Sequence, residues 1–327
     1  MPRPDEPNFD EPGFDAPEAE APPRRMRRAG LGFLILLIVA LGFYYPIGML
    51  VLPSIDDNPE FSISPPPIGS SRAMALAAAL IEREVDQRHW VANDPFFMPG
   101  WMLDDLPNFQ MGIAAGLVRV TQVFAEQAGR PRGQSRLDAD LDRAISLLKY
   151  PGTVWIFDLS AGFGATASSE AQYRAAGKAL IAYNERVAAK RAVFDRRPEA
   201  LIAVLDAVAG DIDTMAALIE TQIAERAGNM LDFTADDLFY SAKGRLYAYA
   251  LFLRELGQDF ERALADKKAE PVWKKMLGAL SKAASLHPWT VINGAPDSML
   301  LPSHLAGLGY SILRARARVA EAAAALK

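Results

Sequence analysis

The longest apolar stretch of the chain covers residues 29–52, which are 24 positions without a formal charge. A helix of that length extends about 36 Å and exceeds the roughly 30 Å hydrocarbon core of a bilayer. Four arginines precede it, at positions 24, 25, 27 and 28, and Asp56 and Asp57 follow it. This charge bias predicts one transmembrane helix with a cytoplasmic amino terminus and an extracytoplasmic remainder. The predicted partner of residues 29–52 is therefore the lipid bilayer.

A cleavable signal peptide is the alternative interpretation of this stretch. Its apolar core would run about 7–15 residues and end in a small-x-small cleavage site. The run here is longer, and its end, Gly48-Met49-Leu50-Val51-Leu52, contains no such site. We therefore expect an uncleaved anchor.

After residue 71 most apolar residues recur at spacings of three and four, the pattern of amphipathic helices. Helices are predicted over about 71–88, from 108 to Gly129, over 135–150, 169–194, from 198 to at least 219, and over 234–268, 271–286 and 303–326. Expected N-caps include Ser70 or Ser71, Asn108, Ser169 and Ser303. The predicted fold class is mainly α: one N-terminal transmembrane helix followed by a multi-helix, bundle-like domain with irregular aromatic and Gly/Pro-rich loops.

One helix carries a heptad seam about three repeats long. The seam consists of Leu201, Leu205, Val208, Ile212, Met215 and Ile219. A coiled-coil dimer is one interpretation, but the seam is short and lacks ordered flanking charge pairs. Packing inside the bundle of a single chain is favoured. Gly210, inside the same helix, is a position where the helix is expected to bend or break.

The chain divides into four regions by composition. Residues 1–23 contain seven prolines and seven acids, which predicts a disordered cytoplasmic tail. Residues 24–52 are the basic flank and the anchor. Residues 53–71 form a linker whose Pro65-Pro66-Pro67 predicts a stiff spacer that holds the domain off the bilayer. Residues 72–327 form the helical extracytoplasmic domain.

Composition and charge narrow the function classes. Half of the chain is apolar and 23% is charged, the balance of an ordinary globular protein. Beyond the residues that precede the anchor the chain holds 30 basic and 33 acidic residues, a net charge of −3, so nucleic acid is not an expected partner. The absence of cysteine excludes disulfides, thiolate chemistry and lipoprotein processing.

Residues 89–107 are irregular and rich in aromatic side chains and prolines. The favoured interpretation is a loop folded over the core, whose aromatics fill gaps between helices. The alternative is a surface that contacts the membrane or an apolar ligand, for which the candidates are Trp90, Phe96, Phe97 and Trp101.

Two motifs imitate cofactor and metal sites. Residues 162–167 match the G-x-G-x-x-A dinucleotide pattern, but the second strand that this site requires is missing. Asp138, Asp140 and Asp142 resemble the start of a calcium loop, but Arg143 stands where that loop needs glycine. No cofactor and no metal are predicted.

The densest group of polar residues lies between two histidines near the carboxy terminus. A hydrolase would use Ser298 or Ser303 as nucleophile, His287 or His304 as base and Asp297 to orient the base. Members of a triad converge from different elements, and no nucleophile elbow is present. Turn formation and capping of the last helix by Ser303 are favoured instead.

Two segments resemble a family of proteobacterial single-span inner-membrane proteins catalogued only as a domain of unknown function. They are Tyr150-Pro151-Gly152-Thr153-Val154-Trp155 and the run NGAPDSMLLPSHLA from Asn293 to Ala306. The likeness extends from about the anchor to the carboxy terminus. It implies an inner-membrane, mostly periplasmic protein, and it supplies no activity.

Three functions follow as hypotheses. The first is an interaction or scaffolding module of the cell envelope with a protein partner. The second is a binding module for a lipid or other apolar ligand that uses residues 90–103. The third is an envelope hydrolase that uses residues 287–304. Enzymatic activity is not predicted as the main role.

Overall fold

The computed structural model describes residues 24–129, 138–157, 164–226, 232–288, 290–294 and 303–327. These residues form helices joined by loops, and within them the one β-bridge pairs Asn293 with Ser303. The predicted fold class, a mainly α chain with an N-terminal apolar helix and a bundle-like domain, is confirmed. The predicted tail, residues 1–23, lies outside the described residues. The chain has two compact units, Met1–Pro46 and Ile47–Lys327.

Helix α1 covers Arg24–Val51, and the boundary between the two units falls inside it. Its segment Gly30–Val51 is long and apolar enough to cross a membrane, and a signal sequence would satisfy the same criteria. The apolar side chains along this segment are exposed to solvent. Pro46 lies within the helix, which continues beyond it to Val51.

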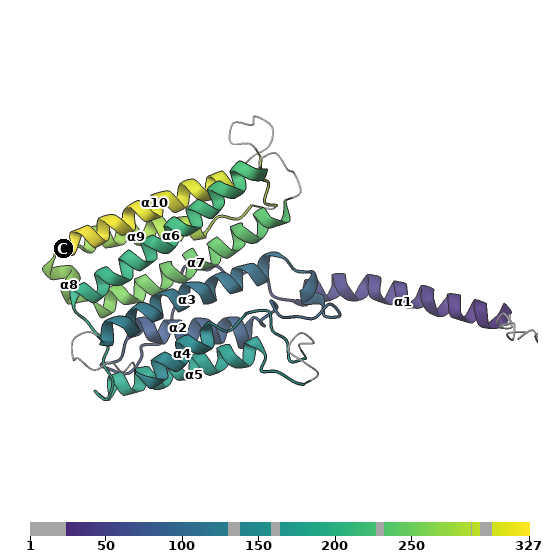
Figure 1. Ribbon diagram of the computed structural model, residues 1–327, viewed down its shortest axis with the longest axis horizontal. Coiled ribbons are helices and arrows are strands. Elements are labelled where there is room, and N and C mark those ends of the chain that lie inside the picture. The colour runs from purple at the N-terminus through teal and green to yellow at the C-terminus, as the bar shows by residue number, and fades with distance from the viewer. Residues whose placement is uncertain (1–23, 130–137, 158–163, 227–231, 289, 295–302) are drawn as a thin grey trace, which may run out of the picture. The chain divides into compact units, whose positions relative to one another are not determined.

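The second unit is a bundle with α7 at its centre (Figure 1). Helix α3 lies along α7, α10 packs on both α6 and α9, and α2 lies between α5 and α7. The bounds are α2 Arg72–Glu82, η1 Arg83–Gln87, η2 Pro99–Met102, α3 Asp105–Gly129, α4 Ala139–Leu148, α5 Ser169–Ala188, α6 Pro198–Arg226, α7 Phe233–Asp259, α8 Glu261–Asp266, α9 Glu270–Ala284 and α10 His304–Ala325.

Glycines let α3 and α7 approach until their backbones touch. A Cβ atom on Gly112 would lie 2.2 Å from the carbonyl oxygen of Ser241, and one on Gly244 would lie 2.1 Å from the carbonyl oxygen of Phe109. Real Cβ atoms do not come this close to backbone, so only glycine fits at either position. Helix α7 is thereby held at the centre of the core.

The heptad seam of α6 is buried inside the bundle of this chain. All six of its residues are at most 2% exposed, and α6 packs against α10 and α3. Packing within one chain, the favoured interpretation, is confirmed. The helix does not break at Gly210, because α6 runs without interruption from Pro198 to Arg226.

Several helix ends agree with the sequence pattern and others shift. Ser71 caps α2 by accepting a hydrogen bond from the Met74 amide, at 3.1 Å. The cap of α5 is Ser168 rather than Ser169, whose buried hydroxyl instead donates to the Pro151 carbonyl, at 2.7 Å. Asn108 lies inside the first turn of α3, which begins at Asp105, so it is not the N-cap of that helix.

Candidate functional site

An open cleft of about 740 Å³ lies where the carboxy-terminal end of α1 meets the starts of α3 and α7. Its apolar wall comprises Met49, Leu50, Leu52, Ile55, Met102, Leu103 and Leu106. Its polar wall comprises Asp104, Asp105, Tyr240, Lys243 and His287. A cleft lined by both apolar and charged side chains suits a ligand that has an apolar part and a charged part.

The segment after α1, residues 53–63, is fastened to α7, and we call it the strap. The Tyr247 hydroxyl donates to the Asn58 carbonyl at 2.9 Å. The guanidinium of Arg254 donates to the Pro59 carbonyl at 2.7 Å and also to the Phe61 carbonyl. The strap is the first part of the linker that the sequence predicted over 53–71, and the stiff spacer at Pro65-Pro66-Pro67 stays a prediction. At least the strap is bound to the bundle, because α7 supplies donors to its main-chain carbonyls.

A buried ion pair joins the strap to the polar wall of the cleft. The Lys243 ammonium, with a side chain only 1% exposed, lies 2.8 Å from Asp57 and donates to the Leu286 carbonyl at 2.7 Å. Burial lowers the pKa of Lys243, and the Asp57 carboxylate opposes that shift. The same carboxylate lies 2.6 Å from Nε2 of His287. Asp57 therefore holds the strap, α7 and the loop after α9 together.

A second buried pair lies at the π-helical turn η1, behind the strap. The Arg83 guanidinium lies 2.6 Å from the Glu84 carboxylate and donates to the Tyr247 hydroxyl at 2.8 Å. It also stacks over the Phe61 ring of the strap at 4.7 Å. Burial raises the pKa of Glu84, and Arg83 opposes this. Single π turns are frequent at functional sites, because the wider turn points neighbouring side chains inward.

Four carboxylates gather where α3 and α7 begin, and two of them line the cleft. Asp104 and Asp105 come from the start of α3, and Asp236 and Asp237 come from the first turn and a half of α7. Burial, followed by the neighbouring carboxyl groups, raises the pKa of Asp236 to about 8 and that of Asp104 to about 6. Within the described chain no ion pair neutralises any of the four. The cluster therefore favours a cation or a proton.

The turn beside the end of α1 exposes a set of large apolar side chains, which we call the aromatic surface. The exposed fractions are 68% for Phe96, 45% for Phe97, 57% for Trp101 and 59% for Phe157. Phe97 packs edge-on against Trp155, which in turn packs edge-on against Phe157. The surface adjoins the end of α1, since a Cβ on Gly48 would lie 2.2 Å from the Pro99 ring.

Hydrogen bonds from buried side chains fix the loops that carry the aromatic surface. The buried Asn93 donates from its amide to the Val154 carbonyl at 2.9 Å and to the Glu170 carboxylate at 2.8 Å, which ties the two loops together. The Trp90 indole donates to the Gly152 carbonyl at 2.7 Å and lies edge-on to Tyr173. The exposed rings are therefore presented by an ordered support.

The favoured interpretation of residues 89–107, aromatics that fill the core, holds for Trp90 and fails for the other three candidates. Trp90 is only 4% exposed and belongs to the core. Phe96, Phe97 and Trp101 are exposed, and Trp101 lies in the short helix η2. The cleft described above is not lined by Phe96, Phe97 or Trp101.

The residues considered for a hydrolase do not converge within the described chain. The Ser303 hydroxyl accepts from the Ala306 amide at 3.2 Å and caps α10, as the capping interpretation predicts. His304 accepts at Nδ1 from the Ile292 amide, at 2.9 Å, and burial lowers its pKa. His287 pairs with Asp57 at the cleft instead. Asp297 and Ser298 lie outside the described residues.

The sequence analysis missed the polar residues of this site, namely Asp57 and Lys243 and, in the cleft lining, Asp104, Asp105 and Tyr240. One signal was available for Lys243, since it stands four residues after Phe239 and three before Leu246, on the buried face of α7. A lysine on an apolar face requires a partner, because a buried unpaired ammonium is strongly unfavourable. The position of its partner, 186 residues earlier in the chain, had no local signature.

The chain was compared with protein families, curated proteins and solved structures. A family model described as "Uncharacterized protein conserved in bacteria (DUF2333)" matches residues 65–234 and 213–325. No curated protein and no solved structure matches the chain.

Proposed function

The chain belongs to the DUF2333 family of uncharacterized bacterial proteins, and from this premise we propose that it is a membrane-anchored binding module for an amphiphilic ligand. In this proposal the amino terminus is cytoplasmic, α1 crosses the bacterial inner membrane once, and the helical bundle is periplasmic. The observation that carries the proposal is the adjacency of the aromatic surface and the amphipathic cleft at the end of α1.

The anchor is supported by the length and apolar character of α1. The 22 residues of Gly30–Val51 extend about 33 Å, slightly more than a hydrocarbon core. Arginines precede the span and aspartates follow it, which favours a cytoplasmic amino terminus. The resemblance to single-span inner-membrane proteins agrees with this orientation.

The aromatic surface supports a bundle that rests on the bilayer. A span that ends near Val51 brings Pro99, which touches the helix at Gly48, to the level of the headgroups. Trp101 and the neighbouring phenylalanines then lie at the depth that amphipathic aromatic side chains prefer. Exposed rings at this position would otherwise be an unfavourable contact with water.

The cleft supports an amphiphile with a positively charged head group. Its lining includes Met49, Leu50 and Leu52 at the end of α1, where acyl chains would reach it, together with Asp104 and Asp105. Lys243 offsets these acids only in part, because its ammonium is paired with Asp57 at 2.8 Å and interacts more weakly with Asp105. An ammonium group would be stabilised by the carboxylates, while its apolar part stays among the leucines and methionines.

An interaction or scaffolding role with an envelope protein is the second candidate. The firm support beneath the aromatic surface favours it, since rings held by Asn93 and Trp90 also suit a protein partner. Ser303 gives no support to a hydrolase, because its hydroxyl caps α10 by accepting a hydrogen bond from the Ala306 amide.

A depth measurement in bilayers tests the contact with the membrane. The chain contains no cysteine, so Trp101→Cys introduces a unique thiol for a fluorophore in the full chain reconstituted in nanodiscs. Lipids with a quencher near the head group should quench the label at position 101. The matched control is Leu313→Cys on α10, a position that is 57% exposed and lies outside the aromatic surface. Equal, weak quenching at both positions would remove the proposed bilayer contact.

A binding measurement tests the ligand class. Dodecylamine and dodecyl sulfate share a tail and differ in head-group charge, and each is titrated below its micelle concentration into nanodisc-held protein labelled at Leu103→Cys beside the cleft. Saturable binding of the amine, lost in Asp104→Asn/Asp105→Asn, supports the proposal. Equal binding of both amphiphiles, or of neither, contradicts it. A crosslinker at position 101 that captures one protein and no lipid would favour the scaffold.

A further inference from the structure

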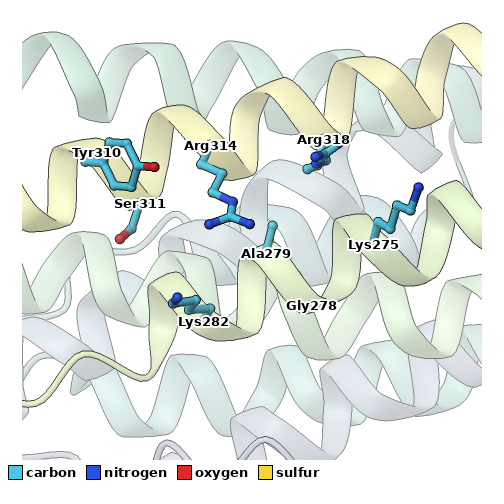
Figure 2. A pocket seen from close by; sticks show the side chains of 8 residues that line it. All are labelled: Lys275, Gly278, Ala279, Lys282, Tyr310, Ser311, Arg314 and Arg318. Atoms are coloured by element: carbon cyan, nitrogen blue, oxygen red, sulfur yellow. The ribbon is translucent and has the colours of Figure 1, made fainter.

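A groove of about 310 Å³ runs between α9 and α10, on a different set of helices from the cleft (Figure 2). Four cationic side chains line it: Lys275 and Lys282 from α9, and Arg314 and Arg318 from α10. Figure 2 shows the Arg314 side chain reaching from α10 toward α9, into the space above Ala279. The groove therefore collects positive charge from two helices.

This charge is largely uncompensated. Among the residues that the structure describes, no acidic side chain lines the groove, although the whole chain has a net charge of −5. Arg318 pairs with Glu321 on its own helix. For Lys275, Lys282 and Arg314 the described residues provide no ion pair. Three unpaired cationic side chains line one groove, so the electrostatic potential inside it attracts anions.

The floor of the groove is shaped by small residues. A Cβ on Gly278 would meet no atom within 4 Å, and Ala279 beside it is the only other α9 residue of the lining without a charge. Tyr310 stands at one end and is 69% exposed. The Ser311 hydroxyl already donates to the Gly307 carbonyl, at 3.1 Å, so the charged groups are the main donors.

The spacing of the cations suits more than one anionic group. Lys275 and Lys282 are seven residues apart, which on a helix is about 10 Å along one face. Arg314 and Arg318 are four residues apart and share a face of the antiparallel neighbour, at about 6 Å. Guanidinium groups bind phosphate oxygens through two parallel hydrogen bonds, and lysines add point charges.

We propose that the groove between α9 and α10 is a binding site for a ligand that carries two or more phosphate groups. Arg314 binds one phosphate at the centre of the groove, and Lys275 and Lys282 hold its neighbours. Tyr310 supplies a flat apolar face at the end of the site. This proposal does not depend on the ligand of the cleft, because the two sites share no residue.

Binding of two probes by the full chain in neutral detergent micelles tests the proposal. Tripolyphosphate represents a soluble phosphate ligand, and cardiolipin in the micelles, whose head group carries two phosphates, represents a lipid. The double variant Lys282→Gln/Arg314→Gln should weaken binding of the preferred probe by about tenfold or more, since each exposed charge pair contributes up to roughly a factor of five. Affinity should also fall steeply with added salt.

The matched control is Lys149→Gln/Arg262→Gln, which removes the same charge from exposed positions outside the groove. It should change affinity less than twofold. Preference for tripolyphosphate identifies a soluble ligand, and preference for cardiolipin identifies a lipid. Equal losses in both double variants, or no saturable binding of either probe, would overturn the site. Unchanged circular dichroism confirms that each variant is folded.

Discussion

Helix α7 has two faces that differ in chemistry although they belong to one element. Toward α3 it presents Gly244 and a dry contact in which backbones touch. Toward the strap it presents Lys243, Tyr247 and Arg254, which meet charges and main-chain carbonyls. Gly244, in the close-packed face, and Lys243, in the face with the buried ion pair, are therefore neighbours in the sequence.

The two faces of α7 have different roles, because one contributes to the stability of the bundle and the other fixes the position of the strap. The glycine contact holds the helices together by shape, and dense packing tolerates little change. Buried ion pairs contribute little net stability, because desolvation of the charges offsets their attraction, but they specify one arrangement of the chain. We infer that the α3 face keeps the bundle folded and that the strap face fixes the geometry of the cleft.

The largest effect is expected from Gly244→Ala. The added Cβ would lie 2.1 Å from the Phe109 carbonyl, so α3 and α7 must separate, and the free energy of unfolding should fall by about 4 kcal/mol or more. Chemical denaturation of the full chain in micelles measures it. Gly210→Ala is the matched control: its Cβ meets nothing within 4 Å, and it should stabilise α6 by about 0.5–1 kcal/mol. Similar effects in both variants would refute the role of the close approach.

The next largest effect concerns the buried pair on the other face. Lys243→Met leaves Asp57 without its ammonium and should reduce stability by about 3 kcal/mol, less than for a fully buried pair because Asp57 is 14% exposed. The double variant Lys243→Met/Asp57→Asn should lose less than Lys243→Met alone, since no charge is then left unpaired. A double-mutant cycle by denaturation measures the coupling. Additive losses would show that the two groups act independently.

A smaller effect should follow pH through the carboxylate cluster. The pKa of Asp236 is raised to about 8, so between pH 4 and pH 8 the folded chain binds more protons than the unfolded chain. Its contribution to stability is therefore present at low pH and is lost as the pH rises toward 8. Solvent screening limits it to about 1 kcal/mol. Thermal unfolding at pH 5.5 and 8.5 should show this difference, and Asp236→Asn should reduce it; an unchanged difference would assign it to other groups.

The smallest effect on stability is expected at the aromatic surface. Trp101→Ala removes a ring that is 57% exposed, so unfolding should change by less than about 0.5 kcal/mol. Trp90→Ala removes a buried ring with a hydrogen bond to Gly152 and should lower stability by about 3 kcal/mol or more. Thermal unfolding of both variants compares two tryptophans from one loop. A large loss in Trp101→Ala would show that it supports the fold.

The helices could be predicted because their periodicity is local. The seam of α6 and the start of α10 at Ser303 follow from spacing and capping chemistry that neighbouring residues determine. Helix ends moved where tertiary contacts intervened. Ser169, for example, is buried against Pro151 and leaves the cap to Ser168.

The candidate site could be predicted only in part. The sequence named Phe96, Phe97 and Trp101 as candidates for a contact surface, but only as the less favoured interpretation. The direction of a side chain in a loop depends on the tertiary contacts that hold the loop. That support, from Asn93 to Val154, spans 61 positions. The strap was missed for the same reason, since its partners Tyr247 and Arg254 lie near the middle of a helix about 190 residues later.

The strap is gripped by its main-chain oxygens at Asn58, Pro59 and Phe61. Every amino acid carries a carbonyl, so the grip at the first two positions does not depend on which side chain stands there. The exposed side chains of Asn58 and Pro59 can therefore change during evolution while the segment stays bound to α7. Homologous chains can thus differ in sequence at these positions and keep the same path of the backbone.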